Sequence, residues 1–180
     1  MAIKFGRPIE MRDAPRRPAA TAAPALDLVS RPRRNRKAEW ARRMVRENVL
    51  TTDDLIWPLF VIDGHNKRAA VASMPGVERL SVDQAVRDAE RAVKLNIPCM
   101  ALFPYTEPSL RDEHGSEALN PENLVCQSVR AIKKEFPGLG VLCDVALDPF
   151  TSHGHDGLIE DGRILNDETV AVLVLSLIHI

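Results

Sequence analysis

Three short apolar runs alternate with helical patterns along the middle of the chain, and this alternation limits the fold more than any other feature. The runs predicted as strands cover residues 55–62, 99–103 and 140–147, and helical periodicity covers 82–96 and 121–136. Strands separated by helices pair in parallel through right-handed crossovers. Three strands cannot close a barrel, which needs eight. The pattern predicts an α/β fold, either a small open sheet or the first part of a barrel.

The N-terminal region differs from the rest in composition. Residues 1–36 are rich in Pro, Ala and Arg and show no sustained period, which predicts an extended arm. A helix is expected over 37–48. Between Arg31 and Arg46 there are eight basic residues and one acid. Such a run is typical of a nucleic-acid or membrane patch, or of a solvated arm that contacts a partner subunit. We favour the arm.

Bulk properties exclude several classes of protein. The net charge is -1, so no global field favours nucleic acid. The longest apolar run, Val170–Ile180, is eleven residues, and about twenty are needed to span a bilayer. Three cysteines without C-x-x-C spacing indicate neither a disulfide framework nor a thiolate zinc site. We expect a cytoplasmic protein that binds no membrane and no nucleic acid.

Titratable side chains crowd the segment that follows the third predicted strand. Within thirteen residues the chain places three carboxylates, two imidazoles and two hydroxyls: Asp144, Asp148, Asp156, His153, His155, Thr151 and Ser152. In parallel α/β sheets, chemistry is placed at the carboxyl ends of the strands. Asp144 is expected inside the strand, and a buried carboxylate needs a partner. An active-site role for Asp144 is therefore the better interpretation.

The two imidazoles leave several interpretations open. Together with Asp148 and Asp156, the pair His153 and His155 could bind a divalent ion through N and O ligands. The plainer alternative is that each imidazole hydrogen-bonds to loop backbone. Two further alternatives use the His153/His155/Asp156 loop: a non-catalytic metal- or partner-binding module, and a metal-dependent hydrolase.

Several segments together carry a resemblance to a known family. The matching segments are Arg33–Arg36, Leu50–Val61, Ser73–Leu80, Ala101–Pro104, Asp144–Gly157 and Asn166–Thr169. In these segments the sequence closely resembles the porphobilinogen synthase family, also called δ-aminolevulinic acid dehydratase. The resemblance runs from about Arg33 to Val174.

The resemblance implies a (β/α)₈ TIM barrel, of which only the N-terminal part, residues 37–174, is present. It also implies a lyase that condenses two molecules of 5-aminolevulinate into porphobilinogen, through Schiff bases on two lysines, for tetrapyrrole and haem synthesis. Such imines turn a carbonyl into an electron sink. The family's strand-end aspartate falls on Asp144, which would orient or deprotonate a substrate amino group. Ser152 is expected to contact the substrate.

The resemblance also bears on metal and assembly. Zinc-dependent members have cysteines at the positions of Ala146, Asp148 and Asp156. Two carboxylates and an alanine cannot make a thiolate zinc site; they favour Mg²⁺ or a monovalent ion, or permit no ion at all here. The chain therefore resembles the non-zinc, magnesium-type branch. The regulatory magnesium site of that branch is expected outside this sequence. The family's N-terminal arm wraps a neighbouring subunit in an octamer, and residues 1–36 suit that role.

The sequence departs from the family at its C-terminus. Family members are roughly twice as long, and both Schiff-base lysines lie in the additional part. The lysines present here match neither position: Lys4, Lys37, Lys67, Lys94, Lys133 and Lys134. Residues 175–180 are nearly all apolar where the family has an amphipathic helix with polar residues. We expect them to be a foreign tail; the alternative is a genuine buried helix end. We therefore expect the chain alone to be inactive and poorly stable.

Overall fold

The computed structural model describes residue 29 and residues 34–180, and the chain divides into two units at Asn48. The first unit contains a 3₁₀ turn, η1 (Arg34–Arg36), and a helix, α1 (Glu39–Val45). The predicted helix over 37–48 is confirmed but shorter, because no side chain caps it and Arg46 is already extended. The predicted arm, residues 1–36, lies almost wholly outside the described residues.

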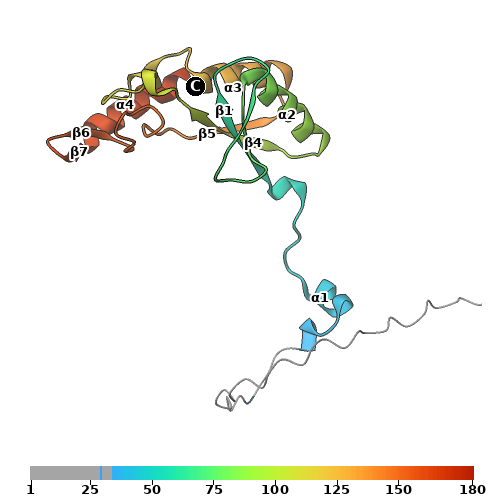
Figure 1. Cartoon of the computed structure of the whole chain (residues 1–180). Helices are drawn as coiled ribbons and strands as arrows, with labels where there is room; N and C mark the ends of the chain where they lie inside the picture. The colour runs from blue at the N-terminus through green and yellow to red at the C-terminus, as the bar shows by residue number, and fades with distance from the viewer. Residues whose placement is uncertain (1–28, 30–33) are drawn as a thin grey trace, which may run out of the picture. The chain divides into compact units, whose positions relative to one another are not determined.

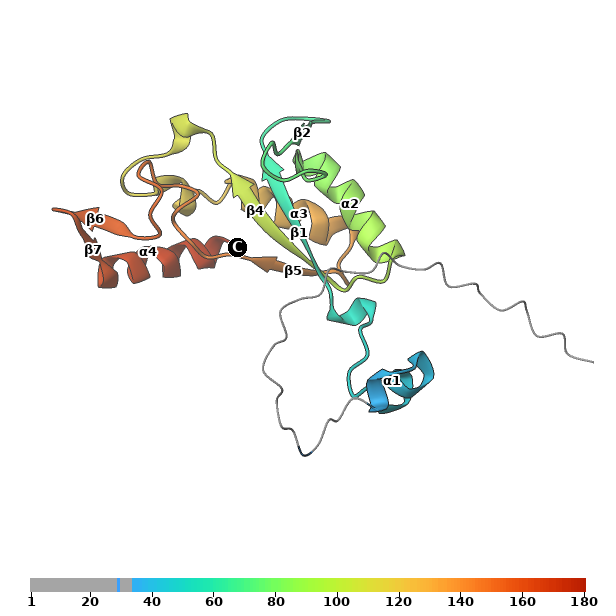
Figure 2. The ribbon, with the colours of Figure 1, turned by 60° about the horizontal axis from the view of Figure 1, so that its bottom comes forward.

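The second unit is built around one five-stranded sheet with strand order β2-β3-β1-β4-β5 (Figures 1 and 2). β1 pairs in parallel with β3 and β4, and β4 pairs in parallel with β5. The antiparallel β2 extends the sheet beyond β3. The strands are β1 (Ile56–Ile62), β2 (Arg68–Ala70), β3 (Glu78–Leu80), β4 (Cys99–Tyr105) and β5 (Gly140–Cys143). The three predicted strands are thus confirmed as neighbours in a parallel sheet.

Two helices cover one face of this sheet, α2 (Val82–Lys94) and α3 (Leu124–Glu135). Side chains alternate along each strand, so Val61 and Leu102 point into the helices and are fully buried. Ala89 lies against them and lets α2 approach closely. Burying each large aliphatic side chain contributes about 1.5–3 kcal/mol to folding. The buried residues of this core are aliphatic apart from Met100, as the 4% aromatic content of the chain predicts.

Within residues 34–180, the opposite face of the sheet carries several exposed apolar side chains. Ile56 is 51% exposed and Leu142 is 43% exposed. Phe60 and Phe103 are aligned in register on the same face, with ring centroids 6.0 Å apart. Within the described residues, β5 is also an edge strand. We name the residues Ile56, Pro58, Phe60, Phe103 and Leu142 the bare face.

Pro58 has no N–H to donate, which predicts an edge strand or a strand start, and the structure meets this prediction only locally. β1 lies in the centre of the sheet. At Pro58, however, β1 is paired only with β4, because the pairing with β3 is limited to Phe60 and Val61. The missing N–H of proline therefore costs no hydrogen bond to β3.

The capping-box pattern Ser81–Gln84 predicts a helix that starts after Ser81, and this start is confirmed without the capping bond, whereas the start predicted from Asn120-Pro121 is wrong. Ser81 precedes α2 but makes no capping bond, because its hydroxyl donates to Asp83 Oδ1 at 2.7 Å and accepts from Lys67 N at 2.9 Å. α3 begins after Asn123, not Asn120. The Asn123 side chain accepts from Cys126 N at 2.9 Å, while Asn120 accepts from Glu122 N in the preceding turn. Competing local hydrogen bonds explain both differences.

A hairpin that the sequence patterns did not predict precedes the last helix. β6 (Leu158–Glu160) and β7 (Arg163–Leu165) pair across Asp161-Gly162, whose φ angles are 49° and 74°. Two residues with positive φ suit the twist of a tight hairpin. The helix α4 (Asn166–His179) follows and continues past Val174. That residues 175–180 are foreign stays a prediction.

Candidate functional site

The polar segment predicted to hold the site begins where β5 ends. Asp144 was expected inside the strand and buried. It instead follows Cys143, the last residue of β5, and is exposed. Cys143 faces α3, so alternation places Asp144 on the side of the bare face. Because Asp144 is exposed to solvent, its carboxylate needs no buried partner and is available to bind a ligand.

Asp156 closes the loop that follows. Its Oδ1 accepts a hydrogen bond from the backbone N–H of Leu147 at 2.6 Å. Leu147 itself is fully buried under α4 residues, with Phe150 beside it. The Asp156 carboxylate therefore returns to the end of the strand and lies in the same region as Asp144 and Asp148.

The three carboxylates are close enough to influence one another. The pKa of Asp148 is raised, first by partial desolvation and then by the negative charges of Asp156 and Asp144. The Arg111 guanidinium opposes this rise. The negative charge of Asp144 and Asp156 beside Asp148 is complementary to a cationic amine.

The carboxylates do not by themselves complete a metal site. Over residues 34–180 no group of three or more His, Cys, Asp or Glu side chains is arranged to hold a metal ion. Ala146, at the third position of the predicted ligand set, is buried and has no donor atom. Asp148 and Asp156 alone are too few for a protein-only Mg²⁺ site. That either residue binds an ion stays a prediction.

His153 adopts the plainer of the two predicted roles. Its Nδ1 accepts from His155 N at 3.1 Å, and its Nε2 lies 3.3 Å from the carbonyl oxygen of Glu113. Both nitrogens are thus used by loop backbone. His155 is exposed, and its carbonyl accepts from Thr151 Oγ1 at 3.0 Å. The Ser152 side chain is exposed beside them.

A second loop supports the first, and the sequence patterns did not single it out. Asp112 Oδ1 accepts from the backbone N–H groups of His114 at 2.9 Å and Ser116 at 3.0 Å. These bonds, that to Ser116 foremost, lower the pKa of Asp112. The Asp112 carbonyl accepts from Ser152 N at 2.9 Å, next to an isolated bridge with Thr151. The Asp-x-x-Gly-Ser pattern, which is typical of an Asx turn, was the available signal.

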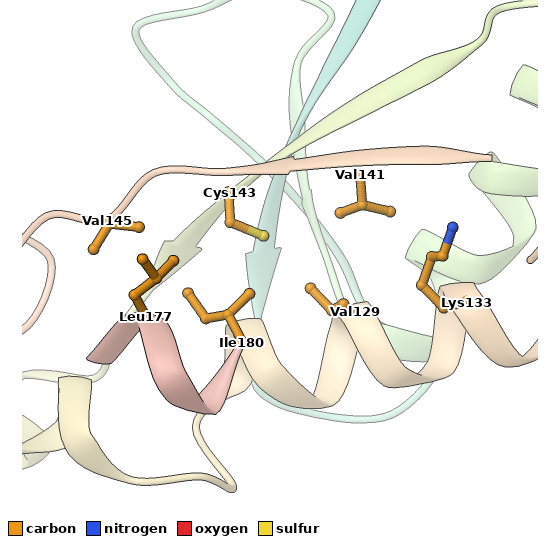
Figure 3. Close-up of a pocket in the computed structure, with 7 residues that line it drawn as sticks. All are labelled: Val129, Lys133, Val141, Cys143, Val145, Leu177 and Ile180. Atoms are coloured by element: carbon orange, nitrogen blue, oxygen red, sulfur yellow. The ribbon is translucent and has the colours of Figure 1, made fainter. Parts of the chain in front are cut away.

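An apolar pocket of about 430 Å³ lies on the other side of β5 (Figure 3). Its lining comes from α3, β5, the segment that follows β5 and the end of α4: Val129, Lys133, Val141, Cys143, Val145, Leu177 and Ile180. Burial raises the pKa of the Cys143 thiol to about 11. A thiol of that kind stays protonated and unreactive near neutral pH. The pocket is therefore separate from the carboxylate site and is not a cysteine active site.

Comparison with known proteins decides the family. The family model for delta-aminolevulinic acid dehydratase matches residues 29–179. The chain belongs to this family. The resemblance found in the sequence therefore agrees with the family match. The two alternative functions, a metal- or partner-binding module and a metal-dependent hydrolase, are not favoured.

Relatives show how much of a family member is present. The delta-aminolevulinic acid dehydratase of Bradyrhizobium diazoefficiens is 83% identical over 174 residues, which are 97% of this chain and 49% of that protein. The enzyme of Chlamydia pneumoniae is 43% identical over 148 residues, covering 82% of this chain and 45% of that protein. The chain thus spans about half the length of these relatives.

A solved structure confirms the fold. The delta-aminolevulinic acid dehydratase from Toxoplasma gondii ME49, in complex with the reaction product porphobilinogen, superposes with a TM-score of 0.78 and 38% identity. The match covers 86% of this chain and 44% of that one. The predicted fold, the N-terminal part of a TIM barrel, is therefore confirmed. None of the described helices is long and apolar enough to cross a membrane.

Proposed function

We propose that this chain is the N-terminal half of a cytoplasmic porphobilinogen synthase, the lyase that condenses two molecules of 5-aminolevulinate in haem synthesis. The observation that carries the proposal is the position of Asp144, exposed at the carboxyl end of a parallel strand beside Asp148 and Asp156. It lies in a chain that is 83% identical to a dehydratase of this family.

The carboxylates and the amine of the substrate have complementary charge. Asp144 would orient the substrate amino group or remove its proton. Asp148, whose pKa is raised by desolvation and by its neighbours, would share that proton. Ser152, exposed on the same loop, would donate a hydrogen bond to the substrate.

The covalent step would require residues from the other half of the barrel. In the described part, Lys94 pairs with Glu90 at 2.6 Å. Lys133 donates to the carbonyls of Pro137 at 2.7 Å and Leu139 at 2.8 Å, at the end of α3. These bonds serve helix ends, not the carboxylate site. The two Schiff-base lysines would be supplied by the part of the barrel that follows, so this chain alone would be inactive.

The side chains present support a proposal for the metal and one for the assembly. Ala146, Asp148 and Asp156 offer no thiolate, so no zinc is expected there, and Mg²⁺ would act at a site outside this chain.

α1 carries Trp40, 68% exposed, and Met44, 79% exposed, among arginines. This surface, with residues 1–36, would contact a neighbouring subunit in a homo-octamer.

The test uses a chimera of residues 1–174 and the second half of the Bradyrhizobium relative. With 5-aminolevulinate it should form a pyrrole, and borohydride should trap labelled substrate on it. Asp144→Asn should reduce turnover by at least about a hundredfold, since general acid–base groups contribute that much. Glu160→Gln, an exposed hairpin residue, is the matched control. A chimera that neither turns over nor traps substrate would disprove the proposal.

A further inference from the structure

The tip of the β6–β7 hairpin is an exposed Asp-Gly pair, and the hairpin projects from the rest of the second unit (Figures 1 and 2). Asp161 and Gly162 form the loop between Glu160 and Arg163, which are paired across the hairpin. Asp161 has a φ angle of 49°. Positive φ is unfavourable for a residue with a Cβ, although aspartate tolerates it better than most. Opening of the turn therefore relieves strain at Asp161.

An Asp-Gly pair can rearrange with no reactant other than water. The amide nitrogen of the glycine bonds to Cγ of the aspartate, and the carboxyl hydroxyl leaves with the amide proton as water. Water then opens the cyclic imide that results. Cleavage of the nitrogen–Cγ bond regenerates aspartate. Cleavage of the bond from nitrogen to the α-carbonyl carbon leaves a main chain that runs through Cβ and Cγ, which is isoaspartate. Glycine favours the attack because it has no Cβ to obstruct it.

At the hairpin tip both reacting groups are accessible. The Asp161 side chain is exposed, and a Cβ added to Gly162 would meet no atom within 4 Å. In a two-residue hairpin the strand hydrogen bonds belong to the flanking residues, so the Gly162 N–H is outside the ladder. A turn with so few contacts opens at low cost in free energy. The nitrogen of Gly162 can therefore reach Cγ of Asp161 without disrupting the core.

The same dipeptide at Asp156-Gly157 is constrained. Asp156 Oδ1 accepts a hydrogen bond from Leu147 N at 2.6 Å, which fixes the carboxylate. Gly157 is buried, and a Cβ there would lie only 2.8 Å from Ile164 Cγ2. The side chain and the peptide are thus held apart from the geometry that ring closure needs.

A third pair, Asp63-Gly64, lies in the exposed loop after β1 and is partly constrained. Gly64 has a φ angle of 131°, and a Cβ there would lie 3.2 Å from Lys67 Cδ. The loop is anchored nearby, because Asn66 N donates to Asp83 Oδ1 at 3.0 Å. We expect its reactivity to lie between those of the other two pairs.

We propose that Asp161 is the principal site of isoaspartate formation in this chain, and that the change loosens the hairpin before α4. Isoaspartate adds one carbon to the main chain of a two-residue loop, and loop length fixes the register of a hairpin. The reaction also frees an α-carboxylate, which is the group that isoaspartyl methyltransferases esterify. The modified hairpin is therefore a substrate for a repair enzyme of that class. The reaction needs only this chain and water, so it does not depend on the proposed function.

The test ages the purified 180-residue chain at physiological temperature and pH. Electron-transfer fragmentation in a mass spectrometer locates isoaspartate, and an isoaspartyl methyltransferase with labelled S-adenosylmethionine counts it. Isoaspartate should accumulate at Asp161 at least about tenfold faster than at Asp156, because a hydrogen bond to a charged group must first break at Asp156. In urea this difference should disappear, since the local structure that protects Asp156 is lost.

Two variants carry the same change at exposed Asp-Gly pairs. Asp161→Glu should remove most of the methyl incorporation, since the longer side chain must close a less favourable ring. Asp63→Glu, the matched control, should leave most of it. Hydrogen exchange over residues 158–165 should be faster in the aged parent chain than in fresh protein, but unchanged in aged Asp161→Glu.

Three results would overturn the proposal. The first is equal accumulation at Asp161 and Asp156 in the folded chain. The second is faster accumulation at Asp63 than at Asp161. The third is a difference between Asp161 and Asp156 that persists in urea, because it would then come from the flanking sequence and not from the hairpin.

Discussion

Asp148 shows how a single residue at this site can oppose folding. Its raised pKa means that the folded chain binds the Asp148 proton more tightly than the unfolded chain does. Its contribution to stability is therefore most favourable at low pH. It becomes unfavourable as pH rises from the ordinary value of 3.8 through the raised pKa.

Asp148→Asn should accordingly stabilise the chain at pH 7, by up to about 1 kcal/mol because the site is partly solvated. The gain should vanish near pH 3.5. Urea unfolding at both pH values measures it, and Glu160→Gln serves as a control of equal charge change. A loss of stability at pH 7 in Asp148→Asn would show that the carboxylates attract a cation and do not repel one another.

At the scale of elements, the loop around Asp112 acts as a support for the loop that carries Ser152. Asp112 Oδ1 holds the His114 and Ser116 amides, and its carbonyl holds Ser152 N. Since its pKa is lowered, this contribution is present above the ordinary value of 3.8. It is lost as pH falls through the lowered pKa.

Asp112→Ala should therefore speed hydrogen exchange at the Ser116 amide by roughly five- to tenfold, or about 1 kcal/mol. Asp112→Asn retains the acceptor oxygen and should change exchange much less. Mass spectrometry of exchange in peptides covering residues 106–119 and 147–156 measures both loops. Equal exchange in the alanine and asparagine variants would contradict a role for the Oδ1 bonds.

At the scale of the whole molecule, the sheet is covered on one side only. The bare face and the free edge of β5 are features that lead to association between chains.

The purified chain should self-associate at micromolar concentration, and Leu142→Glu should reduce this self-association by placing a charge on the exposed face. Sedimentation velocity measures it, with Leu110→Glu, an exposed leucine in η3 (Pro108–Leu110), as the control. A monomeric parent chain would be inconsistent with an open bare face.

The sequence was most informative where a pattern extended over many residues. The strand–helix alternation predicted β1, β4 and β5 and their parallel pairing, because burial of a whole face determines it. Single-residue details failed where several polar partners compete, as at Ser81 and Asn123. The sequence also singled out the region of Asp144 but not its exposure, because the apolar pattern continues to residue 147 while β5 ends at Cys143. Arg79 and Tyr105 are 26 positions apart, so only the register of β3, β1 and β4 reveals their contact.

The free edge of β5 has a consequence during synthesis. As a longer relative leaves the ribosome, the first half of its barrel emerges before the strand that would extend this edge has been translated. The nascent chain would then present an unpaired strand and an uncovered apolar surface for many seconds at typical elongation rates. Chaperones that bind extended apolar segments should therefore engage such a protein midway through translation and release it once the sheet is closed.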